Sequence, residues 1–261
     1  MRAGWVQLYA YRALVASLVW RQLATRYRRS ILGVLWTILN PLLLMGVYSL
    51  VFAFYLRVRT PHYPAFVFSG LLPWLWFASS LGEGVNAIVG GGGLVTRVHF
   101  PPQILPAVTV LANLANFLLS LPVLIVFLAL YGVAPTGRWL LLPVIMAIQL
   151  VFTLGIVFLV AALNVHYRDV QHLVANAIML LFFLTPVLYP ADQVPAVVRR
   201  FLWLNPLTGI IQSYQAIFLG HAANWGIPHR ALACSVVAGI LIAVLGTFTL
   251  ERLRDSFAED L

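Results

Sequence analysis

The chain has 261 residues, of which 62% are hydrophobic and only 9% are charged, and its mean hydropathy is +0.95. Because a water-soluble domain needs a more polar surface than this composition supplies, we predict an all-α integral membrane protein. The net charge of +9 comes from sixteen arginines against seven acids, and there is no lysine. The arginines lie mainly at the ends of apolar runs, which is typical of membrane topology signals, so we expect no nucleic-acid partner.

Two residue counts exclude classes of chemistry. The single cysteine, Cys234, excludes an internal disulfide and a cysteine metal cluster. The phosphate-binding loop of nucleotide hydrolases requires a lysine that reaches the β- and γ-phosphates, and this chain has none. If the protein uses ATP, a separate polypeptide must therefore bind and hydrolyse it.

The first apolar run, residues 5–27, predicts an amphipathic helix that lies on the membrane surface. Aromatic residues and arginines, among them Arg12 and Arg21, border this run, which suits the headgroup layer. The cluster RYRRS at 26–30 follows, and such dense positive charge stays on the cytoplasmic side. We therefore assign residues 1–30 to a cytoplasmic interfacial helix.

Six later runs are candidates to cross the roughly 30 Å hydrocarbon layer, which takes about 20 helical residues. They are residues 31–56, 65–89, 104–131, 139–163, 173–189 and 231–250. Cytoplasmic segments then hold ten arginines and outer segments six, a bias that favours both termini in the cytoplasm. We predict one transmembrane domain over 1–261, with crossings one to five in 31–189, crossing six at 231–250 and a cytoplasmic tail at 251–261.

The segment 190–230 is too polar and too interrupted for one simple crossing. Asn205 is a good N-cap and Pro206 a good first helical residue, so a helix is predicted to begin there, and 194–204 predicts another short amphipathic helix. We predict two half-length helices that dip into the outer leaflet, since broken backbone at membrane depth needs protein or water to satisfy it. The alternative is a seventh crossing at 206–219, which is shorter than the roughly 17 residues required.

Few polar residues lie inside the predicted crossings. Glu83, with Asn86 close behind it, is the only acid within a crossing, and it is either a pathway or helix-pairing residue or an interfacial carboxylate. Asn113 and Asn116 are spaced i and i+3, which predicts hydrogen bonds across a helix interface.

One polar cluster, NVHYRDVQH at 164–172, superficially offers metal ligands and an acid. His166 and His172 are six residues apart with no histidine-rich segment nearby, so we predict a short cytoplasmic turn and no metal site. Nucleophile motifs such as G-x-S-x-G are absent from the sequence. We therefore expect no catalytic residues.

Five segments together resemble one protein family, the permease subunits of ABC transporters that export lipid-linked polysaccharides such as O antigen. The segments are RYRRSILGVLWTILNPLLLMGVYSLVF (26–52), LVTRVHFPPQILP (94–106), ALNVHYRDVQHLV (162–174), LTPVLYP (184–190) and LNPLTGIIQSYQ (204–215). The similarity covers nearly the whole chain, and the segments follow the order expected for that family.

The resemblance implies a homodimer of six-helix subunits in the bacterial inner membrane, in contact with membrane lipids, with two ATPase subunits on its cytoplasmic face. ATP and Mg²⁺ would bind to those subunits, this chain would bind no cofactor, and the cargo would be a lipid-linked polysaccharide. The two short outer helices would form an exit gate that includes Asn205, Pro206 and Tyr214. The alternatives are an export permease for teichoic acid, another lipid or a small drug, and a membrane-embedded glycan-lipid enzyme.

The resemblance also places a coupling helix within 94–106, which would dock into a cleft of the ATPase. A short segment with an apolar anchor, a polar rim and prolines that fix its exit suits docking, although an ordinary positively charged loop is the alternative. The residues assigned to coupling, two of them in the second cytoplasmic turn, are Arg97, Val98, His99, Phe100, Pro101, Arg168 and Asp169.

Aromatic residues on the first crossing predict a lining for the transport path. Tyr48, Phe52 and Tyr55 recur at i, i+4 and i+7, so a regular helix would place them on one face. Flat rings offer sliding contacts to sugar rings, and phenolic hydroxyls can exchange hydrogen bonds with sugar hydroxyls. Because the resemblance places the first and fifth helices at the subunit contact, Phe182 and Tyr189 would complete the lining. The alternative is that this stripe faces lipid.

Overall fold

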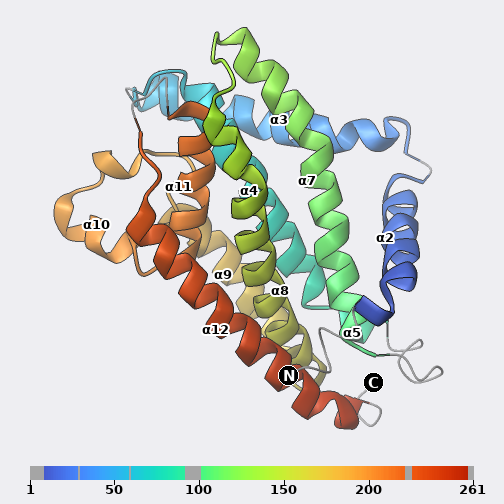
Figure 1. The fold of residues 1–261 in the computed structure, drawn as a ribbon. Coiled ribbons are helices and arrows are strands. Elements are labelled where there is room, and N and C mark those ends of the chain that lie inside the picture. The colour runs from blue at the N-terminus through green and yellow to red at the C-terminus, as the bar shows by residue number, and fades with distance from the viewer. Residues whose placement is uncertain (1–8, 29, 59, 92–100, 221–224, 258–261) are drawn as a thin grey trace.

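The structure, a computed structural model, describes residues 9–28, 30–58, 60–91, 101–220 and 225–257. Every regular element in these residues is a helix (Figure 1), which confirms the predicted all-α class. The α-helices are α2 (Arg12–Tyr27), α3 (Trp36–Ser49), α4 (Tyr63–Gly84), α5 (Ala87–Gly90), α7 (Ile104–Leu130), α8 (Leu142–His166), α9 (Val170–Leu184), α10 (Ala196–Leu202), α11 (Pro206–Leu219) and α12 (His229–Leu253). A π-helical turn, Leu50–Tyr55, continues α3, and short 3-10 turns cover Gly33–Leu35, Gly137–Leu141, Ala191–Gln193 and Arg254–Ser256.

Five helical stretches of the described chain are long and apolar enough to cross a membrane. They are Gly33–Tyr55, Tyr63–Gly84, Ile104–Leu130, Gly137–His166 and His229–Leu253. Each corresponds to one of the predicted crossings, and the protein is a multi-pass membrane protein.

The remaining predicted crossing, 173–189, is shorter in the structure. Helix α9 has 15 residues and ends at Leu184, so it spans about 22 Å. The helix stops because Pro186 disfavours helical backbone at the residue before it, and Thr185 is extended with φ −103° and ψ 135°. The chain from Thr185 onward therefore leaves the helix earlier than the apolar run indicates.

Helix α4 forms the buried centre of the molecule and packs against α3, α7, α8, α9 and α11. It is apolar on all sides, which is the pattern of a helix surrounded by other helices. The aromatic side chains that α4 buries are Tyr63, Phe66, Phe68, Trp74, Trp76 and Phe77.

Helices α8 and α12 make the most extensive helix pair and lie against each other along their length (Figure 1). Their backbones approach closely at Gly155 and Gly246, where a Cβ on Gly246 would overlap the carbonyl oxygen of Gly155. Small residues allow this approach, which is the usual way in which helices associate in a membrane.

The N-terminal helix α2 lies alongside the first half of α7, and α3 then crosses the bundle at a wide angle (Figure 1). Val15 of α2 is buried against Ile104 and Val108, near the start of α7. Further along, Thr37 at the start of α3 contacts Ser120 in the middle of α7. The chain thus rises beside α7 and turns across it at the junction of α2 and α3.

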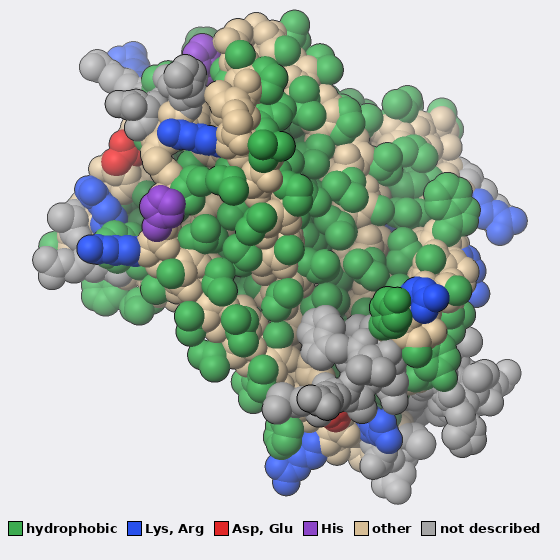
Figure 2. Space-filling view, viewed as in Figure 1, with side chains coloured by type: hydrophobic (Ala, Val, Ile, Leu, Met, Phe, Trp, Pro, Cys, Tyr) green, Lys and Arg blue, Asp and Glu red, His purple; other side chains and the backbone are tan. Residues whose placement is uncertain are grey.

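The surface has the distribution of polar groups that a membrane protein requires. Figure 2 shows hydrophobic side chains over the middle of one face, with arginines gathered at its margins. Arginines at the borders of an apolar band are positioned to contact lipid headgroups.

Candidate functional site

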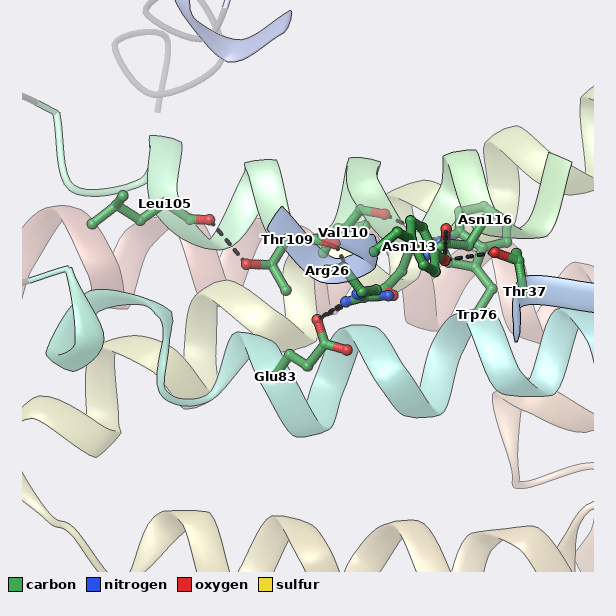
Figure 3. A network of polar contacts seen from close by, with 10 residues as sticks. Arg26, Thr37, Trp76, Glu83, Leu105, Thr109, Val110, Asn113 and Asn116 are labelled. Carbon is green, nitrogen blue, oxygen red and sulfur yellow. Dashed lines mark hydrogen bonds and ion pairs between the residues drawn. The ribbon is translucent and has the colours of Figure 1, made fainter. Parts of the chain in front are cut away.

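Polar side chains from α2, α4 and α7 meet where α2 ends (Figure 3). Helix α2 stops at Tyr27 because Arg28 adopts extended backbone, with φ −65° and ψ 132°. The last two helical residues, Arg26 and Tyr27, form polar contacts with residues of α4 and α7 that are far away in the sequence.

The Arg26 guanidinium holds the three helices together. It forms an ion pair with Glu83 of α4 and donates a hydrogen bond of 3.0 Å to Asn113 Oδ1 of α7. The Asn113 amide in turn donates to Glu83 Oε2 at 3.3 Å, which closes the triangle. The group carries no net charge, so one cation and one anion neutralise each other between membrane helices, where a lone charge would be costly.

Tyr27 extends this network toward α3. Its hydroxyl donates to Asn116 Oδ1 at 2.9 Å and accepts from the Thr37 hydroxyl at 2.6 Å. The Ser120 hydroxyl lies within 3.2 Å of the Thr37 carbonyl oxygen and 3.0 Å of the Asn116 carbonyl oxygen. The junction between α2 and α3 is thus fixed to α7 by neutral hydrogen bonds.

A pocket of about 320 Å³ opens beside these residues. Its walls come from the end of α2, the first turns of α3 and the facing sides of α4 and α7. Trp76 and Phe117 stack against each other in the wall, with ring centroids 5.4 Å apart. A second, polar groove of about 680 Å³ lies among α2, α5 and the start of α7, and Arg26 lines both cavities.

The prediction from the sequence only partly identified the residues of this network. It identified Glu83, Asn113 and Asn116 as polar residues within crossings, and the last two do bond across helix interfaces as predicted. Arg26 was placed only in a cytoplasmic charge cluster, and Tyr27 and Thr37 were not singled out. Asn86 does not line the 320 Å³ pocket. It accepts a hydrogen bond of 3.0 Å from Asn164 of α8.

The predicted cytoplasmic turn at 164–172 is a turn between α8 and α9, with Arg168 and Asp169 exposed. His166 is within 2.9 Å of the Ser256 hydroxyl, and its ring lies against the buried Phe257. The described residues contain no group of three or more histidine, cysteine or acidic side chains arranged to hold a metal ion. His166 thus connects the end of α8 to the segment after α12.

Of the first coupling segment, the structure describes only its end. Arg97, Val98, His99 and Phe100 lie outside the described residues, whereas Pro101 precedes α7 and is partly buried.

The aromatic stripe of the first crossing does not keep to one face. Tyr48 is partly buried and packs against Phe182 of α9, with ring centroids 5.5 Å apart, and Phe52 also packs on the core. Tyr55, however, is 73% exposed. The cause is the π-helical turn Leu50–Tyr55, which has more residues per turn than an α-helix and so rotates Tyr55 away. Of the other proposed lining residues, Tyr189 donates to the Phe183 carbonyl oxygen at 2.7 Å.

Helix α11 begins at Pro206, as the sequence predicts. Asn205 caps the helix, because its side chain accepts a hydrogen bond of 3.1 Å from the Leu207 amide. The same side chain donates a hydrogen bond of 2.8 Å to the hydroxyl of Thr185, just after α9. Helix α11 is buried against α4, α8 and α12, and Tyr214 within it is fully buried. Helix α10, in contrast, projects from the bundle (Figure 1). The two short helices therefore differ, one being part of the core and the other peripheral.

These features define a multi-pass α-helical membrane protein in which polar groups of several helices meet around one pocket. Residues 13–219 match the family model described as ABC-2 type transporter, and the chain belongs to that family. The family resemblance that the five sequence segments indicate is confirmed.

Three curated relatives are similar along nearly their whole length. The O-antigen export system permease protein RfbA of Myxococcus xanthus is 47% identical over 257 residues, which cover 98% of each chain. The protein of the same name from Klebsiella pneumoniae is 33% identical over 243 residues, 92% of this chain and 91% of the relative. The polysialic acid transport protein KpsM of Escherichia coli is 24% identical over 246 residues, 89% of this chain and 92% of the relative.

Proposed function

We propose that the chain is the permease subunit of an ABC transporter that exports a lipid-linked polysaccharide of the O-antigen type across the inner membrane. The observation that carries this proposal is the 47% identity over 98% of the chain to an O-antigen export permease. ATP hydrolysis resides in a separate subunit, because this chain has no lysine with which to build a phosphate-binding loop.

Two chains form the transport path in this proposal, with α3 and α9 at the contact between subunits. Helix α9 supports this role because Val174 is the only buried residue in it, so most of its apolar surface is free to contact a second copy or lipid. The contact between Tyr48 and Phe182 joins α3 to α9 on this side. Aromatic residues here would give the glycan weak, repeated contacts, which a cargo needs in order to move on.

Coupling to the ATPase takes place at the cytoplasmic ends of the helices, with both termini on that side. Arg168 and Asp169 are exposed in the turn between α8 and α9 and are available for docking. The segment with Arg97 and Phe100 supplies the second docking element. Asn205, Pro206 and Tyr214 belong to the gate at the opposite end, where the Asn205–Thr185 bond ties α11 to the end of α9.

Transport of teichoic acid, another lipid or a small drug is the alternative within transport, and a glycan-lipid enzyme is the alternative in another class. Deleting the gene in its native host tests among them. We expect polysaccharide to disappear from the cell surface and to accumulate inside, with recovery only when the permease and its ATPase are both expressed. Unchanged surface polysaccharide together with increased drug sensitivity would contradict the proposal, as would glycan-modifying activity of the purified chain alone.

A further inference from the structure

A smaller pocket, of about 230 Å³, lies at the end of the bundle opposite the turn between α8 and α9. We call it the distal pocket. Its lining comes from α4 and α11 and from the segments that follow α9 and precede α12. Among the described residues, its aromatic and polar lining consists of Phe66, Asp192, Gln212, Gln215 and Trp225. Segments far apart in the sequence therefore meet around it.

The buried Gln215 side chain of α11 brings an unpartnered acceptor to the distal pocket. Its Nε2 donates a hydrogen bond of 3.1 Å to the carbonyl oxygen of Pro186. A carbonyl oxygen can only accept, so the amide nitrogen is fixed on that side and Oε1 is the atom left over. Oε1 accepts no hydrogen bond from another described residue, although Gln215 is only 3% exposed. Because a buried acceptor without a donor is costly, this atom requires a donor from a ligand or from water in the pocket.

A glycine on α4 makes room for this amide. A Cβ added at Gly70 would lie 2.6 Å from Gln215 Nε2, so even an alanine there would displace the amide. The close approach of α4 and α11 at Gly70 thus helps to fix where the Oε1 acceptor lies.

Two further polar side chains of the distal pocket are available to a ligand. Asp192 is exposed and Gln212 is half-buried, and neither side chain forms a hydrogen bond with another described residue. The Asp192 carboxylate only accepts hydrogen bonds, and the Gln212 amide both donates and accepts them. Together with Gln215 Oε1, these groups suit a ligand rich in hydroxyl donors and disfavour a phosphate.

Two arginines beside the distal pocket offset the negative charge of Asp192. Arg199 donates a hydrogen bond of 3.1 Å to the backbone carbonyl oxygen of Asp192, and Arg138 donates one of 2.8 Å to that of Trp225. An ammonium group in the pocket would meet the repulsion of these guanidinium groups as well as the attraction of the carboxylate. A neutral ligand with many hydroxyl groups has no such cost.

Aromatic rings and volume narrow the ligand further. Trp225 packs edge-on against Phe66, with ring centroids 5.3 Å apart, and both residues line the pocket. Aromatic rings beside hydrogen-bonding groups suit a sugar, whose C–H faces are apolar and whose hydroxyls are polar. A volume of about 230 Å³ is below the roughly 300 Å³ at which sites for whole small-molecule ligands begin, so one sugar unit of a longer chain fits.

We propose that the distal pocket binds one sugar unit of the polysaccharide within a single subunit, apart from the path at α3 and α9. The inference rests on the proposed function, which supplies the glycan and places this end of the bundle away from the cytoplasm. Hydroxyl groups of the sugar donate to Gln215 Oε1 and to the Asp192 carboxylate. Gln212 bonds to a further hydroxyl, and the sugar ring lies against Trp225. The pocket is thus a glycan subsite at the exit.

The test measures the binding of a radiolabelled oligosaccharide to the purified full-length chain in phosphatidylcholine nanodiscs. The probe is lipid-free polysaccharide, released from the surface of the native host and cut to a few repeat units. We expect the double variant Asp192→Ala/Gln212→Ala to weaken binding about ten-fold, from two lost hydrogen bonds. Gln193→Ala is the matched control, because Gln193 follows Asp192 but does not line the pocket, and it should leave binding unchanged.

A second variant moves the buried acceptor without removing any lining residue. Gly70→Ala displaces the Gln215 amide and should weaken binding several-fold, whereas Gly46→Ala, with no atom within 4 Å of the added Cβ, should not. All variants are compared at equal amounts of folded protein from size-exclusion chromatography. Unchanged binding by the double variant would overturn the proposal, and unchanged binding by folded Gly70→Ala would overturn the role given to Gln215.

A second probe separates a glycan from a lipid headgroup. Glycerophosphoethanolamine carries the ammonium and phosphate of a phospholipid, and we expect it not to displace the oligosaccharide. Displacement that the double variant abolishes would assign the pocket to an amine headgroup and overturn the proposal. If only the subsite is wrong, all variants bind the oligosaccharide equally and deleting the gene still removes surface polysaccharide. If the proposed function is wrong, surface polysaccharide survives the deletion, so the two failures are distinguishable.

Discussion

Replacing Glu83 with alanine should destabilise the assembly of α2, α4 and α7. The change leaves the Arg26 guanidinium with Asn113 as its remaining partner and removes the acceptor of the Asn113 amide. A fully buried pair that loses one partner costs about 3–5 kcal/mol, whereas an exposed pair contributes about 0–1 kcal/mol. Because the Arg26 and Glu83 side chains are 29% and 41% exposed, we expect an intermediate loss of about 2 kcal/mol.

A loss of this size is measurable as a change in the melting temperature of the detergent-purified chain. With roughly 2–4 °C per kcal/mol for a chain of this size, the midpoint should fall by about 4–8 °C. Arg21→Ala is the matched control, because Arg21 is an exposed arginine on the same helix. It should shift the midpoint by less than about 1 °C.

A double-mutant cycle separates the ion pair from other effects of the substitutions. Arg26→Ala combined with Glu83→Ala should cost less than the sum of the two single variants, because the pair can be lost only once. Additive losses, or a Glu83→Ala variant as stable as the unaltered chain, would refute the assignment of this pair as a connection between α2 and α4.

Two further substitutions test the packing of the bundle and the aromatic stripe. Gly246→Leu should abolish recovery of folded protein in size-exclusion chromatography, because the leucine side chain would overlap Gly155. Gly46→Ala is the control and should be tolerated, because no atom lies within 4 Å of the added Cβ. Normal recovery of the leucine variant would contradict the close approach of α8 and α12. Tyr48→Ala should reduce export of surface polysaccharide at least several-fold in a complementation assay, while Tyr55→Ala should have little effect. Equal effects of the two tyrosine variants would contradict this prediction, because Tyr48 and Tyr55 would then act as one surface despite the π-helical turn.

Local sequence signals predicted the elements well where the signal and its structural effect lie close together. Apolar runs of sufficient length gave five of the crossings, since length and hydropathy alone decide whether a helix can span. Asn205 followed by Pro206 marked the start of α11, because a cap and a proline act within one turn. Pro186 carried the matching stop signal for α9, and reading it would have corrected the end of the fifth crossing.

The polar site was not accessible to the same reasoning. Arg26 and Glu83 are 57 residues apart, and nothing local indicates that the end of α2 faces α4. The charge cluster containing Arg26 has an ordinary explanation as a topology signal, which hid its role in the pocket. The π-helical turn at Leu50–Tyr55 was also missed, because it inserts into an apolar helix without glycine or proline to mark it.

Reconstitution tests the proposed export function most directly. The purified permease and its ATPase are placed in proteoliposomes with lipid-linked polysaccharide, and the exposure of the glycan to an added glycosidase is measured before and after ATP addition. Glycan should move across the membrane only when both subunits and ATP are present, and the permease alone should bind no nucleotide. Glycan movement without the ATPase would contradict the proposed function. So would a complete system that moves no glycan but transports another class of lipid or a drug.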